Sequence, residues 1–593
     1  MRPFWRSFWA SILAYVVLSL IAIIILNFII FSLGSVFKNN NEISIEDNTF
    51  LEMNLDFKIS ERDGVETTND LMNPISKSFS IHKVKSAIET AKNDDKIKGI
   101  VLKIKNISMG LSSVNDLRNK LNEFKEDGKF IIAYAENYSM GTFYLSSVAD
   151  QVYLYPQGMI DFRGLGSELM FFKNALERLE IDVQVLRGEG NVFKGAVEPF
   201  ILDKMSNENK LQIKKLLSDV WKNMTHNIRD SRNLSLEKLN EIADSLYSYN
   251  SIGCLKQELV DDLIYEDQLD SIIKKILNVE TNSELNSMSF KKYLSKKDNV
   301  FNSKKGNIAI VYATGEITSG KSTNTSMGSE TIVKSITEVR NDSSIKALVL
   351  RVNSPGGSAL ASDVIWRSIE LTKKIKPVIV SMGDVAASGG YYISCGADRI
   401  FAEENTITGS IGVFGIIPNL GKMLNSKIGI TFDRVETNKH SAVTMFNKLD
   451  KKELSTFQKG VNEIYDTFIS KVAFGRDGLK KTDVHEIAKG RVWSGKEALD
   501  LELVDEIGYL SNAVDFAAKK ANINQNNIKV VEFPKKETDK FLDVLADLNF
   551  NTASENEVSD FLKTFNKQIK NSLLNTKNKD KFQMILPFEI KIQ

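Results

Sequence analysis

Short apolar runs alternate with amphipathic segments along most of the chain. The runs "IKALVLRV" (345–352) and "KPVIVSMG" (376–383) have the composition of buried strands, and the segment 358–374 between them carries apolar residues at helical spacing. A strand, helix, strand order predicts right-handed crossovers between parallel strands, and therefore an α/β fold. In such folds ligands bind at the carboxyl ends of the strands.

The same pattern occurs twice. "IKGIVLKIKN" from Ile97 matches "IKALVLRVNS" from Ile345, and "YLSSVADQVYLYP" from Tyr144 matches "YISCGADRIFAEE" from Tyr392, both at an offset of 248 residues. A further pair, "ELVDD" and "ELVDE", follows at nearly the same spacing. The period is too long for a solenoid, so the chain is expected to contain a duplicated domain.

The N-terminal segment has the character of a membrane anchor. No charged residue occurs from Ser7 to Phe37, and a helix over about 8–34 is long enough to cross a bilayer with some tilt. Arg2 and Arg6 precede it, so the positive-inside rule places the N-terminus in the cytoplasm and the remaining chain outside. A cleaved signal peptide is the alternative, but the apolar stretch is long for one and lacks a clear small-x-small site.

These observations predict five parts. The C-terminal tail (536–593) is expected to form one or two polar amphipathic helices followed by "MILPFEIKIQ", which is either a strand or a docking segment. The loop 318–330 is either a flap near a site or a linker. The parts are an anchor (1–45), a first repeat (46–290), a linker (291–306), a second repeat (307–535) and a C-terminal tail (536–593).

Composition excludes several classes of function. The 593 residues include 77 basic and 76 acidic side chains, so the net charge of +1 implies no general attraction to nucleic acid. Two cysteines, Cys254 and Cys395, lie in apolar segments of different repeats, which indicates buried thiols and neither a disulfide framework nor a zinc site.

A serine between small residues is the first candidate for chemistry. In "GDVAASGGYYISCGAD" (383–398), Ser388 follows a predicted strand and precedes two glycines. A serine hydroxyl becomes a nucleophile when a base removes its proton and backbone N–H groups stabilise the oxyanion. A tight strand-to-helix turn without chemistry would use the same small residues.

The duplication helps to separate these two interpretations. Met140 occupies the position in the first repeat that corresponds to Ser388, and "KNISM" (105–109) replaces "NSPGG" (353–357). The first repeat has therefore lost the hydroxyl and the glycines but has kept the strands around them. We infer that the second repeat is chemically competent and that the first repeat is scaffold.

The base is less evident from the residues. None of the four histidines lies in a motif of a Ser-His-Asp triad. Lys194, in "RGEGNVFKGAVEPF", stands among small and apolar residues and could act as a neutral amine if burial lowered its pKa. The surrounding glycines do not match a phosphate-binding loop. A structural role for Lys194 remains open, and His440, at the corresponding place of the second repeat, is a rival base.

Five motifs together resemble the long, duplicated form of signal peptide peptidase A, or protease IV, a membrane-anchored serine protease family with a Ser-Lys dyad. They are "NSPGG", "GDVAASGGYYIS", "TGSIGVFG", "FKGAVEPF" and "RVWSGKEALDLELVDEIG". The resemblance implies two tandem domains of the Clp protease and crotonase type. It also implies Ser388 as nucleophile, Lys194 from the other repeat as general base, and Ser410 as the residue whose hydroxyl positions the amine. The implied oxyanion donors are the backbone N–H groups of Gly389 and of Gly356 or Gly357.

The resemblance further implies a homotetramer in the bacterial inner membrane with a periplasmic catalytic domain. The implied substrates are peptides in or near the membrane, such as signal peptides after their release, and neither a cofactor nor a metal is needed. Two other interpretations remain. The chain could be an inactive membrane scaffold of the same fold, or an acyl-CoA enzyme of the crotonase type, although the predicted topology would keep it from that cofactor.

Overall fold

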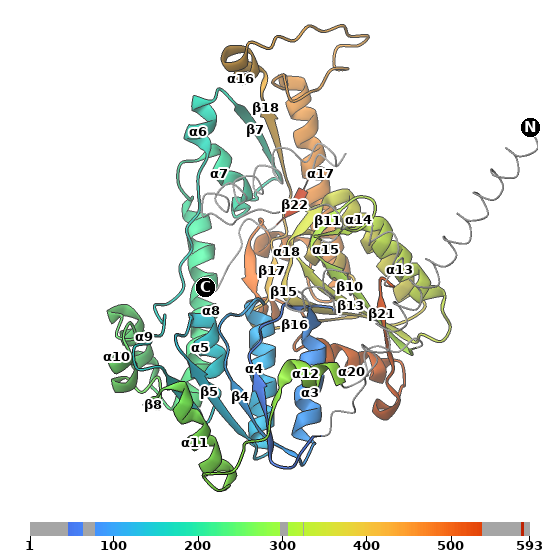
Figure 1. Cartoon of the computed structure of the whole chain (residues 1–593). Helices are drawn as coiled ribbons and strands as arrows, with labels where there is room; N and C mark the ends of the chain where they lie inside the picture. The colour runs from blue at the N-terminus through green and yellow to red at the C-terminus, as the bar shows by residue number, and fades with distance from the viewer. Residues whose placement is uncertain (1–44, 63–77, 297–305, 324, 536–582, 586–593) are drawn as a thin grey trace, which may run out of the picture.

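The computed structural model describes residues 45–62, 78–296, 306–323, 325–535 and 583–585 (Figure 1). The predicted anchor helix at about 8–34 lies outside these residues. Among the helices that are described, none combines the length and the hydropathy that a membrane crossing requires. The described chain forms three large sheets and one two-stranded sheet.

The first sheet is built from the first repeat and is parallel throughout. Its central run, "IKGIVL", buries Ile100, Val101 and Leu102 completely, as expected for a parallel sheet that is covered on both faces. The strands in spatial order are β8 (Asp262–Leu263), β6 (Gln151–Leu154), β5 (Phe130–Ala135), β4 (Ile97–Leu102), β1 (Thr49–Met53) and β9 (Ser287–Ser289), and the helices after β3, β4 and β5 are α3 (Ile81–Lys92), α4 (Leu111–Glu126) and α5 (Met140–Ser146).

The second sheet repeats this arrangement in the second half of the chain. Its strands are parallel except for the pair β17 and β19, and α14 (Ala359–Lys373) forms the crossover between the two strands predicted from their apolar runs. The predicted α/β fold with parallel sheets is thus confirmed. The strands in order are β19 (Val492–Ser494), β17 (Ile407–Gly409), β15 (Val378–Ala387), β13 (Ala347–Ser354), β10 (Ile308–Thr314) and β21 (Val530–Phe533), with β16 (Arg399–Ala402) beside β15 and β20 (Glu506–Ile507) beside β16.

A third sheet combines segments from both repeats and from the C-terminal tail. A strand of the first repeat, β7, pairs antiparallel along its whole length with β18 of the second. The loop predicted at 318–330 contributes a strand to this sheet, and so does the end of the tail. The order is β12 (Ser326–Gly328), β11 (Glu316–Thr318), β14 (Gly356–Ser358), β22 (Gln583–Ile585), β18 (Phe414–Asn419) and β7 (Asp182–Arg187).

Two long helices tie the repeats together. The first repeat sends α8 (Asn207–Arg232) against β19 of the second sheet, and the second repeat sends α17 (Lys451–Gly475) against β7. Figure 1 shows α8, in teal, running down one side of the molecule, and α17, in orange, in the upper part of the view where β7 and β18 also lie. The predicted domain boundaries stay predictions, and α12 (Phe290–Lys296) begins one residue before the predicted linker. The other elements are α6 (Lys173–Arg178), α7 (Glu198–Ile201), α9 (Leu236–Ser245), α10 (Ser251–Lys256), α11 (Glu266–Leu277), α12 (Phe290–Lys296), α13 (Ser329–Asn341), α15 (Gly389–Ser394), α16 (Gly421–Met423), α18 (Lys481–Ile487), α19 (Gly495–Asp500), α20 (Leu510–Lys520), β2 (Ile59–Ser60), β3 (Phe79–Ser80), the 3₁₀ turns η2 (Gly195–Val197) and η4 (Gln525–Asn527), and the π turn η3 (Leu424–Ile428).

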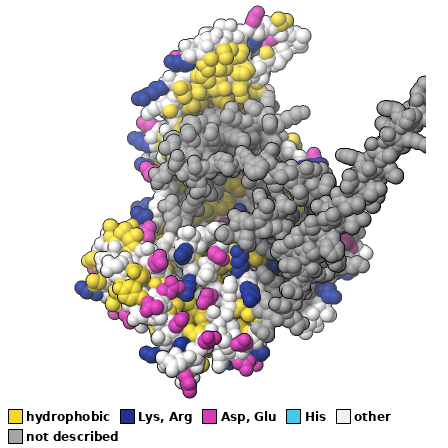
Figure 2. Space-filling view, viewed as in Figure 1, with side chains coloured by type: hydrophobic (Ala, Val, Ile, Leu, Met, Phe, Trp, Pro, Cys, Tyr) yellow, Lys and Arg dark blue, Asp and Glu magenta, His cyan; other side chains and the backbone are white. Residues whose placement is uncertain are grey.

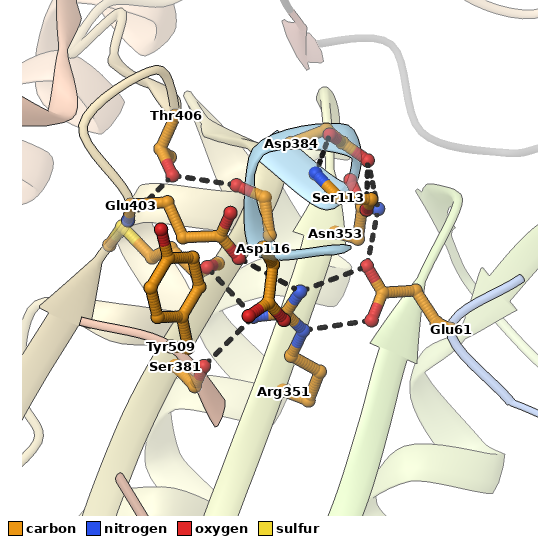
Figure 3. Close-up of polar contacts among 12 residues, drawn as sticks. Glu61, Ser113, Asp116, Arg351, Asn353, Ser381, Asp384, Glu403, Thr406 and Tyr509 are labelled. Atoms are coloured by element: carbon orange, nitrogen blue, oxygen red, sulfur yellow. Dashed lines mark hydrogen bonds and ion pairs between the residues drawn. The ribbon is translucent and has the colours of Figure 1, made fainter. Parts of the chain in front are cut away.

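A buried network of charged side chains joins the repeats (Figure 3). Arg351 on β13 is almost fully buried, and its Nε lies 2.8 Å from Oε2 of Glu61, which follows β2 of the first repeat. The same guanidinium donates to Ser381 Oγ at 2.9 Å and approaches Glu403 Oε1 at 3.4 Å. An arginine inside an otherwise apolar strand is therefore accounted for by carboxylates that come from both repeats.

Asp384, four residues before Ser388, makes a second connection between the repeats. Its Oδ1 accepts the backbone N–H of Ser113 at 3.2 Å, and its Oδ2 lies 3.2 Å from Ser113 Oγ. Ser113 lies in the first turn of α4, where backbone N–H groups have no partner within the helix. The second repeat thus supplies a cap to a helix of the first, close to the turn that carries Ser388.

The buried network predicts a large loss of stability when its cation is removed. Replacing Arg351 by methionine leaves Glu61 and Glu403 buried without their common partner, so the free energy of unfolding should fall by about 3–5 kcal/mol. Urea denaturation measures the change. Arg229→Met is the matched control because the ion pair of Arg229 with Asp230 is largely exposed, and it should change stability by less than about 1 kcal/mol. Equal effects of the two variants would contradict a role for the network in joining the repeats.

Candidate active site

Ser388 lies at the junction of β15 and α15 in an unusual backbone conformation. Its φ is +56° and its ψ is −112°, a region that residues other than glycine rarely adopt. Hydrogen bonds on both sides hold this turn, because Ser388 N–H donates to Gly409 O at 2.8 Å and Tyr392 N–H donates to Ser388 O at 2.9 Å. In the first repeat, the corresponding helix α5 begins at Met140 after Ser139, whose φ is an ordinary −74°. Strained turns of this kind cluster at functional sites.

Lys194 reaches Ser388 from the first repeat. It lies between β7 and α7, and its Nζ is 2.8 Å from Ser388 Oγ, 2.9 Å from Ser410 Oγ and 3.0 Å from Ser410 O. All three residues are fully buried. Burial lowers the pKa of Lys194 well below its usual value, because the charged ammonium loses its hydration there. The structure therefore brings together the three side chains that the sequence singled out.

A second set of residues, which the sequence analysis did not identify, holds the lysine turn. Gln212 on α8 donates through Nε2 to Phe193 O at 2.8 Å, and Phe193 N–H donates to Lys489 O at 3.0 Å. Gly490 follows with a φ of +79°, and a side chain there would place its Cβ 2.7 Å from Lys194 Cβ. The only signal in the sequence is that Gly490 directly precedes the quoted motif "RVWSGKEALD".

Three glycines meet beside the turn that carries Ser388. Gly357 has a φ of +152°, and a Cβ there would lie 2.1 Å from Ile317 O, so this backbone cannot accept a side chain without moving. A Cβ at Gly389 would lie 3.2 Å from Gly356 Cα. The N–H of Gly356 donates to Ser354 Oγ at 3.2 Å. The arrangement places backbone of β14 next to the first residue of α15.

The rival base and the two cysteines lie elsewhere. His440 is exposed on the segment between η3 and α17, and its Nδ1 is 3.0 Å from Glu453 Oε1. Cys254 and Cys395 are buried free thiols, as predicted. Ser388 thus has the amine of Lys194, not an imidazole, within hydrogen-bond distance.

Comparison with known proteins agrees with the two repeats. The sequence pattern of peptidase family S49 matches residues 123–280 and 370–524, and that of Clp protease matches 304–408. The chain is 36% identical over 467 residues to Protease 4 of Haemophilus influenzae, covering 76% of this chain and 75% of that protein. It is 32% identical over 484 residues to the chloroplastic serine protease SPPA of Arabidopsis thaliana, covering 80% and 70%. It is 35% identical over 193 residues to the putative signal peptide peptidase SppA of Enterococcus faecium, covering 32% and 56%.

Proposed function

Because this chain belongs to peptidase family S49 and is a serine peptidase, we propose that Ser388 and Lys194 form its catalytic dyad and that Ser410 positions the amine. The observation that carries the proposal is the distance of 2.8 Å between Lys194 Nζ and Ser388 Oγ, two fully buried groups from different repeats. A buried amine with a lowered pKa can act as a general base.

The hydrogen-bonding capacity of a neutral amine fits this assignment. Such an amine has two N–H groups and one lone pair. Two oxygens of Ser410 lie within reach of the N–H groups, and Ser410 Oγ can itself donate to Gly490 O at 3.4 Å. The lone pair then faces the hydroxyl of Ser388, which is the orientation that proton removal needs.

The reaction follows from these positions. Lys194 takes the proton of Ser388 Oγ as this oxygen attacks the carbonyl carbon of a peptide bond. Backbone N–H groups of Gly389 and of Gly356 or Gly357 stabilise the oxyanion. Since Gly356 N–H already donates to Ser354 Oγ, Gly357 is the better placed of the pair. The lysinium then protonates the leaving amine, and water releases the acyl group by the reverse path.

The setting of the reaction is also proposed. The uncharged segment 7–37 would anchor the chain in the bacterial inner membrane, with the catalytic part in the periplasm. The substrates would be peptides in or near the membrane, such as remnant signal peptides, an idea supported by the name of the Enterococcus faecium relative, a putative signal peptide peptidase. They would bind as extended strands through main-chain hydrogen bonds. Neither nucleic acid nor a cofactor is part of this proposal.

An exposed apolar surface supports the proposed homotetramer. Hydrophobic side chains gather at the end of the molecule where α16, β18 and β7 lie (Figure 2). Just beyond α16, the segment 428–435 exposes four large apolar side chains, which are Ile428, Ile430, Phe432 and Val435. Exposed apolar groups in such numbers are typical of an interface between subunits.

A peptide boronate tests the nucleophile directly. Boron accepts an electron pair from an activated serine oxygen, so an apolar peptide boronate should inhibit the full chain in detergent and show a tetrahedral ¹¹B NMR signal. The signal should vanish in Ser388→Ala and persist in His440→Ala. If the wild-type chain neither binds the boronate nor hydrolyses fluorogenic peptides, the proposal fails and the inactive scaffold replaces it.

Ser410 is expected to contribute through Lys194. Ser410→Ala removes one of the two oxygens that hold the amine, so kcat should fall about 10- to 100-fold, the loss of one strong hydrogen bond, while KM changes little. Thr408→Val is the matched control, since Thr408 Oγ1 donates at 2.8 Å to Ala386 O on the neighbouring strand and is not in contact with the amine. Steady-state kinetics on a fluorogenic peptide distinguishes them, and equal losses would remove the positioning role.

A further inference from the structure

Gln212, in the second turn of α8, makes hydrogen bonds in two directions. Its Nε2 donates to Phe193 O at 2.8 Å and to Asn209 Oδ1 at 2.9 Å, and its Oε1 accepts the backbone N–H of Val492 at 3.3 Å. The residue is only 1% exposed. A side-chain amide carries two N–H groups and one carbonyl oxygen, so each polar atom of Gln212 has a partner within the protein.

The donor side of this amide holds the turn that carries the proposed base. Phe193 directly precedes Lys194, so its carbonyl belongs to the peptide bond that joins the two residues. Asn209 continues the contact, because its Nδ2 donates to Oε2 of buried Glu198 at 2.9 Å. A Cβ at Gly195 would lie 2.6 Å from the same nitrogen. Polar side chains of α8 therefore contact the residues on both sides of the lysine.

The acceptor side of the amide holds an edge of the second sheet. β19 is last in the described strand order of that sheet, and its Val492 N–H is bound by the amide oxygen from α8. On its inner side Val492 pairs with Gly409 of β17. Gly409 O accepts the backbone N–H of Ser388 at 2.8 Å, and the N–H of Ser410 donates to Arg491 O at 2.6 Å. The strand bound by the amide thus supports the backbone of both serines of the candidate active site.

Apolar side chains surround this connection. Leu216, one turn further along α8, packs with Ile407 and Val492 in a small buried cluster. Hydrogen bonds in such surroundings are electrostatically stronger than in water, and a buried polar group that loses its partner destabilises the structure. Without the amide, Phe193 O and the N–H of Val492 would each lose a partner inside the protein.

A glutamine on the other long helix provides a comparison. Gln458 on α17 donates through Nε2 to Arg187 O at 2.7 Å and to Asn462 Oδ1 at 2.8 Å. It therefore also binds a backbone carbonyl of the segment that leads to Lys194, and this carbonyl belongs to the other repeat. Its bonds end at β7, seven residues before the lysine, whereas those of Gln212 reach the lysine turn and β19.

We propose that Gln212 is a positioning residue of the protease, whose side-chain amide fixes the turn of Lys194 against the strands that hold Ser388 and Ser410. This inference rests on the proposed function. The hydrogen bonds of Gln212 go to backbone groups and to Asn209, so it acts through the lysine and not on the reacting atoms. A displacement of about 1 Å between reacting groups can lower a rate about 100-fold, so an amide behind the lysine turn can control the rate.

A positioning role predicts two effects that a purely stabilising contact would not produce. A looser turn holds Lys194 Nζ less often at 2.8 Å from Ser388 Oγ, so kcat falls while KM changes little. It also admits water to the amine. Hydration favours the charged form, so the pKa of Lys194 should move back towards its usual value. The rise of kcat/KM with pH should therefore shift to higher pH.

Steady-state kinetics of Gln212→Met in the full chain, in detergent and on a fluorogenic peptide, tests the proposal. Methionine has nearly the length of glutamine and replaces none of its hydrogen bonds. We expect kcat to fall about 10- to 100-fold with KM within about threefold of the wild-type value. The midpoint of the pH profile of kcat/KM should rise by about half a unit or more. Gln458→Met is the matched control and should keep the wild-type midpoint and a kcat within about threefold. Equal kcat values or equal midpoints of the two variants would overturn the inference.

Gln212→Asn carries the test if the methionine variant does not fold. Its amide is one methylene shorter and cannot reach Phe193 O and Val492 N–H together, so kcat should still fall by about threefold or more and the midpoint should still rise. A wild-type kcat and midpoint in this variant would also overturn the inference. Failure of the proposed function is distinguishable, since Lys194→Met would then remain active. If Lys194→Met is inactive and Gln212→Met behaves as Gln458→Met, the dyad stands and only the positioning role of Gln212 is wrong.

Discussion

Replacing Lys194 by methionine is expected to reduce the hydrolysis of an apolar peptide by about 10⁴-fold or more, and replacing Ser388 by alanine should have the same effect. Methionine has nearly the length of lysine and no basic atom, so it fills the buried site without providing a base. Without the amine 2.8 Å from its oxygen, the hydroxyl of Ser388 keeps its proton at neutral pH. The double variant should be no slower than either single variant, because the two groups act as one unit.

His440→Ala is the control for these variants. His440 is exposed and its Nδ1 contacts Glu453, so its loss should leave kcat/KM within about threefold of the wild-type value. Near-ultraviolet circular dichroism should confirm that each variant is folded. If Lys194→Met kept more than about one per cent of the wild-type rate, another group would have to remove the proton, and the dyad across the repeats would be wrong.

The fold could be predicted from the sequence because each buried strand is a local run of apolar residues. A run such as "IKALVLRV" is apolar over the length of one strand, and its partner at an offset of 248 residues has the same character. Parallel sheets that are buried on both faces require such runs. Arg351 within the run was not explained by the sequence, because its partners Glu61 and Glu403 approach from distant segments.

Only part of the candidate active site could be predicted from the sequence. Ser388 could be proposed from its small neighbours and from the methionine at the equivalent position of the first repeat. Its pairing with Lys194 depended on a family resemblance, since no local pattern says which of many lysines becomes buried. Gly490 was missed because its close contact with Lys194 forms only when the repeats meet, and Gln212 because its hydrogen bond to Phe193 O joins two segments that lie 19 residues apart.

The tail shows the limit of local reasoning most clearly. The motif "MILPFEIKIQ" suggested either a strand or a docking segment. A strand of three residues has no periodicity of its own, and β22 is defined by its pairing with β14 and β18. The strands that pair with β22 lie more than 160 residues away in the chain. They bind it through backbone groups that every sequence has, so the sequence of the tail does not identify them.

The proposed base is the neutral form of Lys194, so the activity should rise with pH. Burial lowers the pKa of this amine well below its usual value. Below that lowered pKa, each unit of pH raises the fraction of neutral amine about tenfold, so log(kcat/KM) should rise with a slope of about one and level off above it. A rate measured on a peptide ester from pH 5 to 10 gives the profile. A profile that falls with pH over this range would exclude a lysine base.

The titration of Lys194 should also affect the free energy of unfolding, and the direction of this effect follows from the pKa shift. Because the pKa of Lys194 is lower in the folded chain than in the unfolded chain, the unfolded chain binds more protons between the two values, and stability rises with pH in that window. Lys194→Met removes this dependence. This variant should therefore be more stable than the wild type at pH 7, with a smaller difference near pH 10. Lys334→Met, which replaces an exposed lysine on α13, should change stability by less than about 0.5 kcal/mol at either pH. An amine kept neutral by burial destabilises the fold that holds it, and urea denaturation of these three proteins at pH 7 and pH 10 would measure this loss of stability independently of any substrate.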